Sequence, residues 1–160
     1  MDALEMSLIG LDDEAQAAIL PMLGKECCRV RFDVPGLSLG FGEKIPHNLP
    51  GLTFSYYGEW EIGTTFCGWR VLDKESSILC GSDDYHDSGY IERILTAIHF
   101  GRIISIANPT RLDVRVGLTS GIFVDFMTTS STNGECFHVF CPNSVYVEFT
   151  IGGVWRVGKI

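Results

Sequence analysis

Residues 112–126 read LDVRVGLTSGIFVDF, with apolar side chains recurring at every second position on both sides of the turn Thr119-Ser120-Gly121. A period of two is typical of β-strands that bury one face, and Thr, Ser and Gly between two such runs are typical of a hairpin. The segment therefore predicts two antiparallel strands that share an apolar face.

The same pattern recurs along most of the chain. Residues 30–34 (VRFDV) and 37–41 (LSLGF) alternate across Pro35-Gly36, and residues 145–149 (VYVEF) and 154–157 (VWRV) alternate across Gly152-Gly153. Further strands are predicted over residues 69–72, 78–80 and 103–106. The chain is therefore expected to be rich in antiparallel sheet.

Two segments predict helices instead. Residues 12–23 have acidic residues in the first turn, where they suit the helix dipole, and Pro21 and Gly24 limit the helix. In the second helix apolar residues recur at i, i+3, i+4 and i+7, with Asp87 or Ser88 as the N-cap and Gly101 at the end. This apolar stripe consists of Ile91, Ile94, Leu95 and Ile98.

These elements occur twice at a nearly constant offset. Gly24 and Gly101 are 101 − 24 = 77 residues apart, and Gly58 and Gly134 are 134 − 58 = 76 residues apart. The spacing predicts an α+β fold with an internal pseudo-repeat, because each copy would be one helix-plus-antiparallel-sheet unit sharing a core with the other. We expect a single domain, 1–160, with units over about 11–81 and 87–160 and a linker at 82–86.

Three segments predict loops. Residues 43–51 contain two prolines close together, which cannot both lie in a central strand. Residues 127–134 are polar and too long for a tight turn, and residues 82–89 separate the two units. Function is expected first in these loops.

Composition narrows the range of partners. Twelve Lys and Arg against twenty Asp and Glu give a net charge of −8, which repels nucleic acid and anionic membranes and favours a basic protein partner. The N-terminus is acidic and no apolar run reaches membrane-spanning length, so we expect a cytoplasmic protein. That compartment favours free thiols at all six cysteines.

The densest polar cluster is residues 83–87, DDYHD. Its carboxylates could bind a divalent cation, but the spacing of a calcium loop is absent, so no metal site is predicted. The favoured interpretation is a solvated linker in which Asp87 caps the second helix. A third interpretation is an acidic patch for a basic partner, formed by Asp83, Asp84 and Asp87.

A cysteine–histidine motif offers a different chemistry. Cys136 and His138 are two residues apart and would share one face of a strand, with Cys141 nearby. No orienting acid or second Cys-His set is apparent, so half-buried structural cysteines are favoured over catalysis. The glycines form no phosphate-binding loop, and no cofactor is predicted.

Aromatic residues crowd into residues 56–69. Tyr56, Tyr57 and Trp60 could anchor a protein partner if they face outward, with Glu59 and Glu61 as an acidic rim. Most of these rings are expected in the core, because large aromatic residues are highly buried on average.

The order of elements resembles that of small acidic bacterial immunity-type domains of polymorphic toxin systems. The resemblance consists of a short acidic helix, Gly-Lys or Gly-Arg junctions at residues 24–25 and 101–102, a Gly-Glu-Trp segment at 58–60 and the terminal GGVWRV at 152–157. It implies a protein that neutralises a cognate toxin by binding it, without catalytic residues.

The sequence therefore predicts a non-enzymatic binding protein with a protein partner, in which the acidic residues steer the partner and the aromatic residues anchor it. The alternative is a small-molecule-binding or hydrolytic domain with a pocket between the two units, where Cys136 or Cys141 would act with His138.

Overall fold

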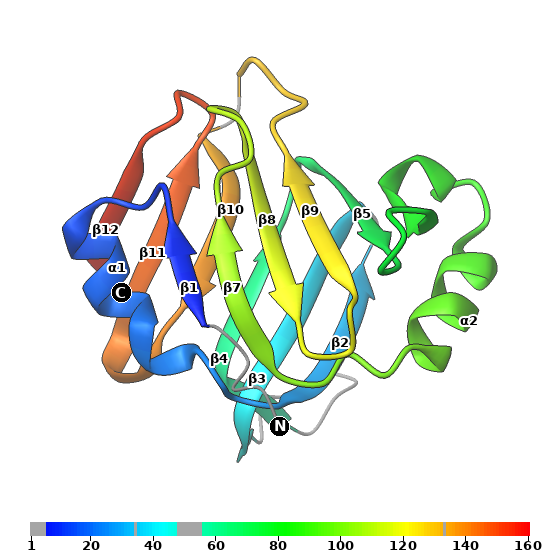
Figure 1. Ribbon diagram of the computed structural model, residues 1–160, viewed down its shortest axis with the longest axis horizontal. Helices are drawn as coiled ribbons and strands as arrows, with labels where there is room; N and C mark the ends of the chain where they lie inside the picture. The colour runs from blue at the N-terminus through cyan, green and yellow to red at the C-terminus, as the bar shows by residue number, and fades with distance from the viewer. Residues whose placement is uncertain (1–5, 34, 48–55, 133) are drawn as a thin grey trace.

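Two six-stranded sheets form the molecule, and two short helices lie beside them (Figure 1). The computed structural model describes residues 6–33, 35–47, 56–132 and 134–160. The first sheet has the strand order β1-β7-β8-β9-β5-β6, and the second has the order β12-β11-β10-β4-β3-β2. The fold is thus mixed α+β and mostly sheet, as the alternating runs predicted.

The first sheet is antiparallel except where β1 pairs with β7 in parallel. Its strands are β1 (Ser7–Ile9), β5 (Gly68–Leu72), β6 (Ile78–Gly81), β7 (Ile103–Ala107), β8 (Asp113–Leu118) and β9 (Phe123–Met127).

The second sheet is antiparallel throughout. Its strands are β2 (Cys27–Asp33), β3 (Gly36–Pro46), β4 (Tyr56–Thr64), β10 (Glu135–Phe140), β11 (Val145–Thr150) and β12 (Trp155–Lys159). Strand β3 extends through part of the expected 43–51 loop, because a bulge at Gly42, with φ +86°, lets the chain continue beside β4. Residues 48–51 of that loop lie outside the described residues.

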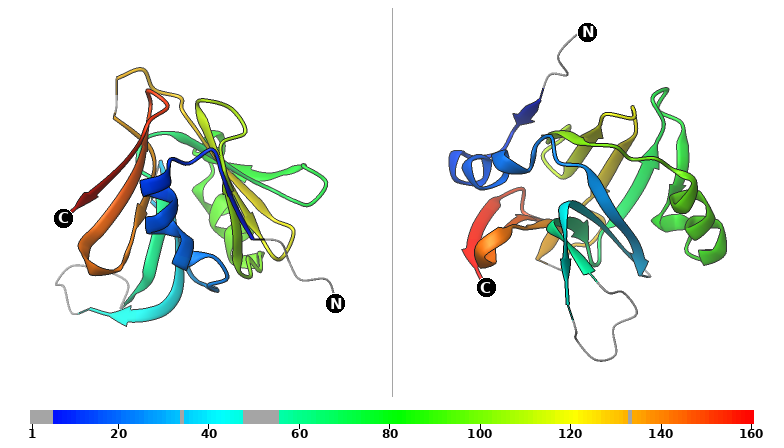
Figure 2. Two further views of the ribbon diagram at one scale, coloured as in Figure 1. Left: turned by 60° about the vertical axis from the view of Figure 1, so that its left-hand side comes forward. Right: turned by 90° about the horizontal axis from the view of Figure 1, so that it is seen from below.

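The core lies between the two sheets, which face each other as two layers (Figure 2). The rings of Phe126 on β9 and Phe137 on β10 are 5.0 Å apart across the layers, and both side chains are fully buried. The inward-facing apolar side chains of both sheets are buried in this core. Removing their surface from water is the main favourable contribution to folding.

The helices lie at the two ends of the sandwich rather than on a sheet face (Figure 1). Helix α1 (Asp13–Ile19) continues into a 3₁₀ turn, η1 (Leu20–Met22), where Pro21 prevents a regular last turn. It packs near β11 and β12. Helix α2 (Ser88–Ala97) packs near β2 and β6.

The predicted N-cap of α2 is confirmed, since the Asp87 carboxylate accepts a hydrogen bond from the Tyr90 N–H at 2.9 Å. The predicted end at Gly101 is wrong: the helix stops at Ala97 and Ile98 is already extended. Gly101 has a positive φ of +77°, but it serves the turn into β7. The expected linker contains the 3₁₀ turn η2 (Ser82–Asp84).

The two halves of the chain do not form separate helix-on-sheet layers. Strands β2 to β4 lie in the second sheet, but β5 and β6 cross to the first; β7 to β9 lie in the first, but β10 to β12 cross to the second. Both sheets are therefore built from both halves, and one continuous core results.

Candidate functional site

A groove runs over the outer face of the second sheet, on the side away from the core. Strand β3 directs Leu37 and Leu39 into the core, so its alternate residues, Gly36 and Ser38, face outward with almost no side chain. The flanking strands carry larger outward side chains, and a hollow of about 480 Å³ results. We call it the outer groove; its walls include Arg29, Arg31, Tyr57, Phe66, His138 and Phe140.

Glu61 forms the polar floor of the outer groove. Its carboxylate accepts hydrogen bonds from Arg29 Nη1 at 3.0 Å, from the Gly58 N–H at 2.8 Å and from Ser38 Oγ at 2.9 Å. Glu61 is only 8% exposed, and a buried carboxylate is tolerated when its oxygens are bonded in this way. The floor is therefore polar but fixed in one arrangement.

His138 stands on the opposite wall, on β10. Its Nδ1 donates to the Glu135 carboxylate, and its ring lies 4.6 Å from the ring of Phe140. A bulge between Glu135 and Phe137 lets the carboxylate reach back to the imidazole. The histidine is thus held in one orientation at the groove wall.

Two exposed phenylalanines stand at the rim. Phe66 is 59% exposed and Phe140 is 44% exposed, and both line the groove. Large apolar side chains left in water beside a hollow are typical of surfaces that contact a partner. The outer groove thus combines an apolar rim with a polar floor, the Glu61 carboxylate, which is already hydrogen-bonded within the protein.

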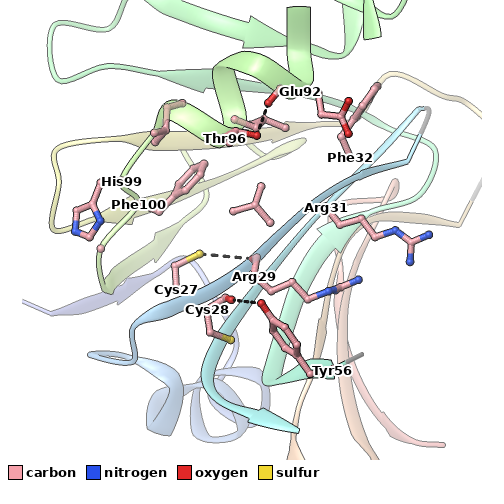
Figure 3. A pocket seen from close by; sticks show the side chains of 14 residues that line it. Cys27, Cys28, Arg29, Arg31, Phe32, Tyr56, Glu92, Thr96, His99 and Phe100 are labelled. Carbon is pink, nitrogen blue, oxygen red and sulfur yellow. Dashed lines mark hydrogen bonds between the residues drawn. The ribbon is translucent and has the colours of Figure 1, made fainter. Parts of the chain in front are cut away.

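A second, larger hollow lies on the other side of β2. It lies between the side of β2 that faces away from β3 and the C-terminal half of α2 with the segment 98–101, and its volume is about 970 Å³ (Figure 3). At one end of the hollow the Cys27 N–H donates a hydrogen bond to the Gly101 carbonyl at 2.8 Å. Residues 27–32 all line it, and Glu92, Thr96 and His99 come from the opposite wall. We call this hollow the edge cleft.

The cysteine–histidine motif is not assembled into one site. Cys136 is fully buried, and its Sγ lies 3.9 Å from the Leu112 carbonyl, whereas His138 faces the outer groove. Cys141 follows β10, and its Sγ approaches the carbonyl of Val139. The bulge after Glu135 breaks the alternation that would have put Cys136 and His138 on the same face.

The thiols are also poorly ionised. Burial raises the pKa of Cys136 to about 12 and that of Cys141 to about 11. Burial also raises the pKa of Cys27 to about 12 and that of Cys80 to about 11. All six cysteines are free thiols. A thiol with such a pKa is almost wholly protonated at neutral pH and is a weak nucleophile.

The predicted aromatic anchors are divided by the sheet. Trp60 is 5% exposed and packs in the core, so it is not available to a partner. Tyr57 lines the outer groove, and Tyr56 lines the edge cleft, where its hydroxyl donates to the Cys28 carbonyl at 3.1 Å. Glu59 forms an ion pair with Lys25 at 3.3 Å.

The predicted acidic patch consists of Asp83, Asp84 and Asp87, and it does not lie on β4 with Glu59 and Glu61. Asp84 accepts from the Gly81 N–H at 2.9 Å and Asp87 caps α2, so both have local structural roles, while Asp83 is exposed. None of the three lines either hollow. Within the part of the chain that the structure describes, no group of three or more His, Cys, Asp and Glu is placed to hold a metal ion.

Sequence reasoning missed Arg29, Arg31, Ser38 and Phe140, and it placed Phe66 only in the aromatic run 56–69 without choosing it as an anchor. One signal was present: small residues at 36, 38 and 40 alternate with core residues, which indicates a strand whose outer face is hollow. Which strands flank β3, and therefore which large side chains form the groove walls, depends on the order of strands in the sheet. Local sequence patterns do not predict that order.

No helix among the described residues is long and apolar enough to cross a membrane. Comparisons of the chain with protein-family models, with curated proteins and with solved structures found no match.

Proposed function

We propose that this chain is a non-enzymatic binding protein that grips a protein partner through the outer groove. The observation that carries the proposal is the pair of exposed rim residues, Phe66 and Phe140, above a floor in which Glu61 is already bonded. Exposed aromatic side chains can bury against a partner, while a pre-paired floor keeps its shape on binding.

The role we propose is that of an immunity protein, which neutralises a cognate toxin in the cytoplasm by covering it. A net charge of −8 supports this role, because it speeds the encounter with a basic partner such as a nucleic-acid-cleaving toxin domain. Asp83 and Asp87 are exposed and contribute to this long-range field rather than to the groove.

Three features support binding rather than catalysis. The pKa of Cys136 is raised by burial, Cys136 and His138 occupy different environments, and the Glu61 carboxylate is engaged by three donors. A nucleophile needs an accessible, activated atom, and a general base needs a lone pair free to accept a proton.

We also propose that the two halves descend from one repeated unit. Each half runs as a helix, a three-strand meander in one sheet and then strands in the other sheet. The halves meet at their corresponding glycine turns, where Glu26 and Arg102 form an antiparallel bridge next to Gly24 and Gly101. This arrangement supports a doubled ancestor, for which the 76- to 77-residue offset was the first sign.

The test is co-expression with each protein encoded beside this gene, followed by copurification, growth rescue and measurement of affinity. We expect one neighbour to be toxic alone and to bind this chain. Phe66→Ala with Phe140→Ala should weaken that binding about tenfold or more, because truncated anchors lose their buried contacts. Ile78→Ala is the matched control, since Ile78 is 60% exposed but lies on the other sheet.

Two results would contradict the proposal. One is that none of the neighbouring products binds and a substrate panel shows turnover. The other is that a partner binds but the rim variant and the Ile78→Ala control keep equal affinity.

A further inference from the structure

We propose that the outer face of the first sheet is a second interaction surface, where Arg70 and Arg115 together bind a carboxylate side chain of a protein partner. We call these two residues the arginine pair. The inference goes beyond the proposed function and does not rest on it, because the outer groove lies on the other sheet of the sandwich.

The first step is the position of the arginine pair in the sheet. Strand β9 lies between β8 and β5, and Asp125 on β9 is paired with Arg115 on one side and Arg70 on the other. Residues paired directly across strands share a face of the sheet. Val124 and Phe126, the neighbours of Asp125 along β9, are buried in the core, so the three charged side chains form a row on the outer face.

The surroundings of this row leave the arginine pair accessible. The next residues in the row are small, since Ala107 on β7 pairs with Arg115 and Gly81 on β6 pairs with Arg70. In Figure 1 strands β7, β8 and β9 face the viewer, and α1 and α2 lie to either side of them. The side chains of Arg70 and Arg115 are 39% and 35% exposed. A partner can therefore reach both guanidinium groups from the outside.

The second step is which hydrogen-bond donors remain on the arginine pair. The Asp125 carboxylate accepts from Arg115 Nε at 2.7 Å and Nη2 at 3.0 Å, and from Arg70 Nε at 2.9 Å. Among the described residues no further hydrogen bond engages either guanidinium, so both Nη atoms of Arg70 and Nη1 of Arg115 can still donate. The Arg115 guanidinium also lies over the Phe123 ring, 5.4 Å from its centre, and this contact helps to fix its orientation.

The third step is the charge of the row. The Asp125 side chain is only 3% exposed, and its single negative charge is shared by two guanidinium groups, so one positive charge remains at the surface. A carboxylate brings one negative charge, and its two oxygens match the N–H groups of a guanidinium. A phosphate monoester would bring almost two negative charges, and a net charge of −8 repels nucleic acid. The matching ligand is therefore a carboxylate.

The neighbouring side chains define the rest of the occupant. Phe123 and Met127 are half-buried on the same face of β9, one on each side of Asp125 along the strand, and would contact apolar groups next to the bound carboxylate. Asp113, on the same face of β8, accepts a hydrogen bond from Thr110 Oγ1 at 2.8 Å and would repel a second acidic group. The occupant is thus one aspartate or glutamate side chain flanked by apolar residues, rather than a run of acidic residues.

The experiment selects a phage-displayed library of random twelve-residue peptides on the full chain and removes every peptide that also binds the variant Arg70→Lys/Arg115→Lys. The variant keeps both positive charges beside Asp125 but lacks the Nη donors. We expect the remaining peptides to share an aspartate or glutamate. Replacing that residue by asparagine or glutamine should lower the affinity for the wild-type protein about tenfold or more, because a charge-assisted hydrogen bond is lost.

The matched control is Arg93→Lys/Arg156→Lys, which makes the same substitutions at exposed arginines on α2 and β12. This control variant should retain the peptides that the arginine-pair variant fails to bind. The inference is overturned if the two variants retain the same peptides, if no peptide is specific for the arginine pair, or if the specific peptides need no acidic residue.

A measurement on the wild type does not depend on how the variants fold. The Nε–H signals of Arg70 and Arg115 in a ¹⁵N NMR spectrum should shift on addition of N-acetyl-glutamate methylamide, and the uncharged N-acetyl-glutamine methylamide should leave them in place. Equal shifts with both compounds, or none with either, would also overturn the inference. The rim variant Phe66→Ala/Phe140→Ala tests the proposed function separately, since those residues line the groove on the second sheet.

Discussion

Arg29 Nη1 lies 3.0 Å from Glu61 Oε1 although the two residues belong to strands that are not neighbours. Gly40 lies between them on β3 and is paired with Arg29 on one side and Glu61 on the other. A Cβ at position 40 would stand 2.9 Å from Glu61 Oε1 and 3.1 Å from the Arg29 Cβ. The ion pair at the groove floor therefore exists because the intervening residue has no side chain.

We expect Gly40→Ala to destabilise the protein by about 1–3 kcal/mol, the usual cost of overpacking a filled site. The added methyl group would push the Glu61 carboxylate away from its donors. Urea denaturation of the variant and the wild type measures the difference in the free energy of unfolding. Gly152→Ala is the control, since a Cβ there meets its nearest atom at an ordinary 3.8 Å. Equal losses in the free energy of unfolding of Gly40→Ala and Gly152→Ala would contradict the role assigned to Gly40.

The coupling of Arg29 and Glu61 can be measured directly. Their side chains are 9% and 10% exposed, so Glu61→Ala leaves a nearly buried guanidinium without its carboxylate. We expect a loss of about 3 kcal/mol, as for other buried pairs from which one partner is removed.

Arg29→Met in the Glu61→Ala background should recover part of that loss, because the buried guanidinium that has lost the Glu61 carboxylate is then removed as well. A double-mutant cycle from urea denaturation gives the coupling energy. Strictly additive single-variant effects would mean that the contact contributes nothing to stability.

A second ion-pair cluster, on the first sheet, predicts a dependence of stability on pH. Burial by itself would raise the pKa of Asp125, but hydrogen bonds from Arg115 and Arg70, together with their charges, outweigh burial and hold the pKa below its ordinary value of 3.8. The folded state therefore releases this proton more readily than the unfolded state. The resulting stabilisation is complete above the ordinary pKa and is lost as the pH falls through the lowered one.

Asp125→Asn removes this titration. We expect wild type and Asp125→Asn to differ by a constant free energy of unfolding from pH 7 to about pH 5, and the difference to shrink progressively at pH values below about 4. Urea denaturation across this range provides the measurement, and Asp83→Asn, at an exposed aspartate, serves as the control. A difference in the free energy of unfolding between wild type and Asp125→Asn that stays unchanged down to pH 3 would contradict the lowered pKa of Asp125.

Local pattern was enough to predict most strands. The runs at 112–116 and 145–149 alternate cleanly because one face of each meets the core, and the structure has β8 and β11 there. Strand β1 was missed because three residues show no periodicity, and it forms only by parallel pairing with β7, about a hundred residues later. The exchange of strands between sheets was also missed, because crossover depends on packing and not on local spacing.

The candidate sites were harder to predict than the strands. Glu61 and Trp60 are adjacent in one aromatic and acidic run, but alternation sends Trp60 into the core and Glu61 to the groove floor. The edge cleft depends on where α2 stands relative to β2, and neither segment alone contains that information. The residues that could be predicted are those whose role is local, such as the Asp87 cap.

The raised thiol pKa values predict slow and steadily pH-dependent alkylation. Burial raises the pKa of Cys27 to about 12, although its side chain lines the edge cleft and can be reached by a small reagent. Because the thiolate is the reactive form, the rate with iodoacetamide should rise about tenfold for each pH unit from 7 to 9, with no plateau. Cys28 and Cys141, the other two half-buried cysteines, are changed to serine, and the three buried cysteines are kept. Peptide mass spectrometry of this variant in its native state then follows the labelling of Cys27. A plateau near neutral pH would reveal an activated thiol and would favour a hydrolytic role over the binding role proposed above.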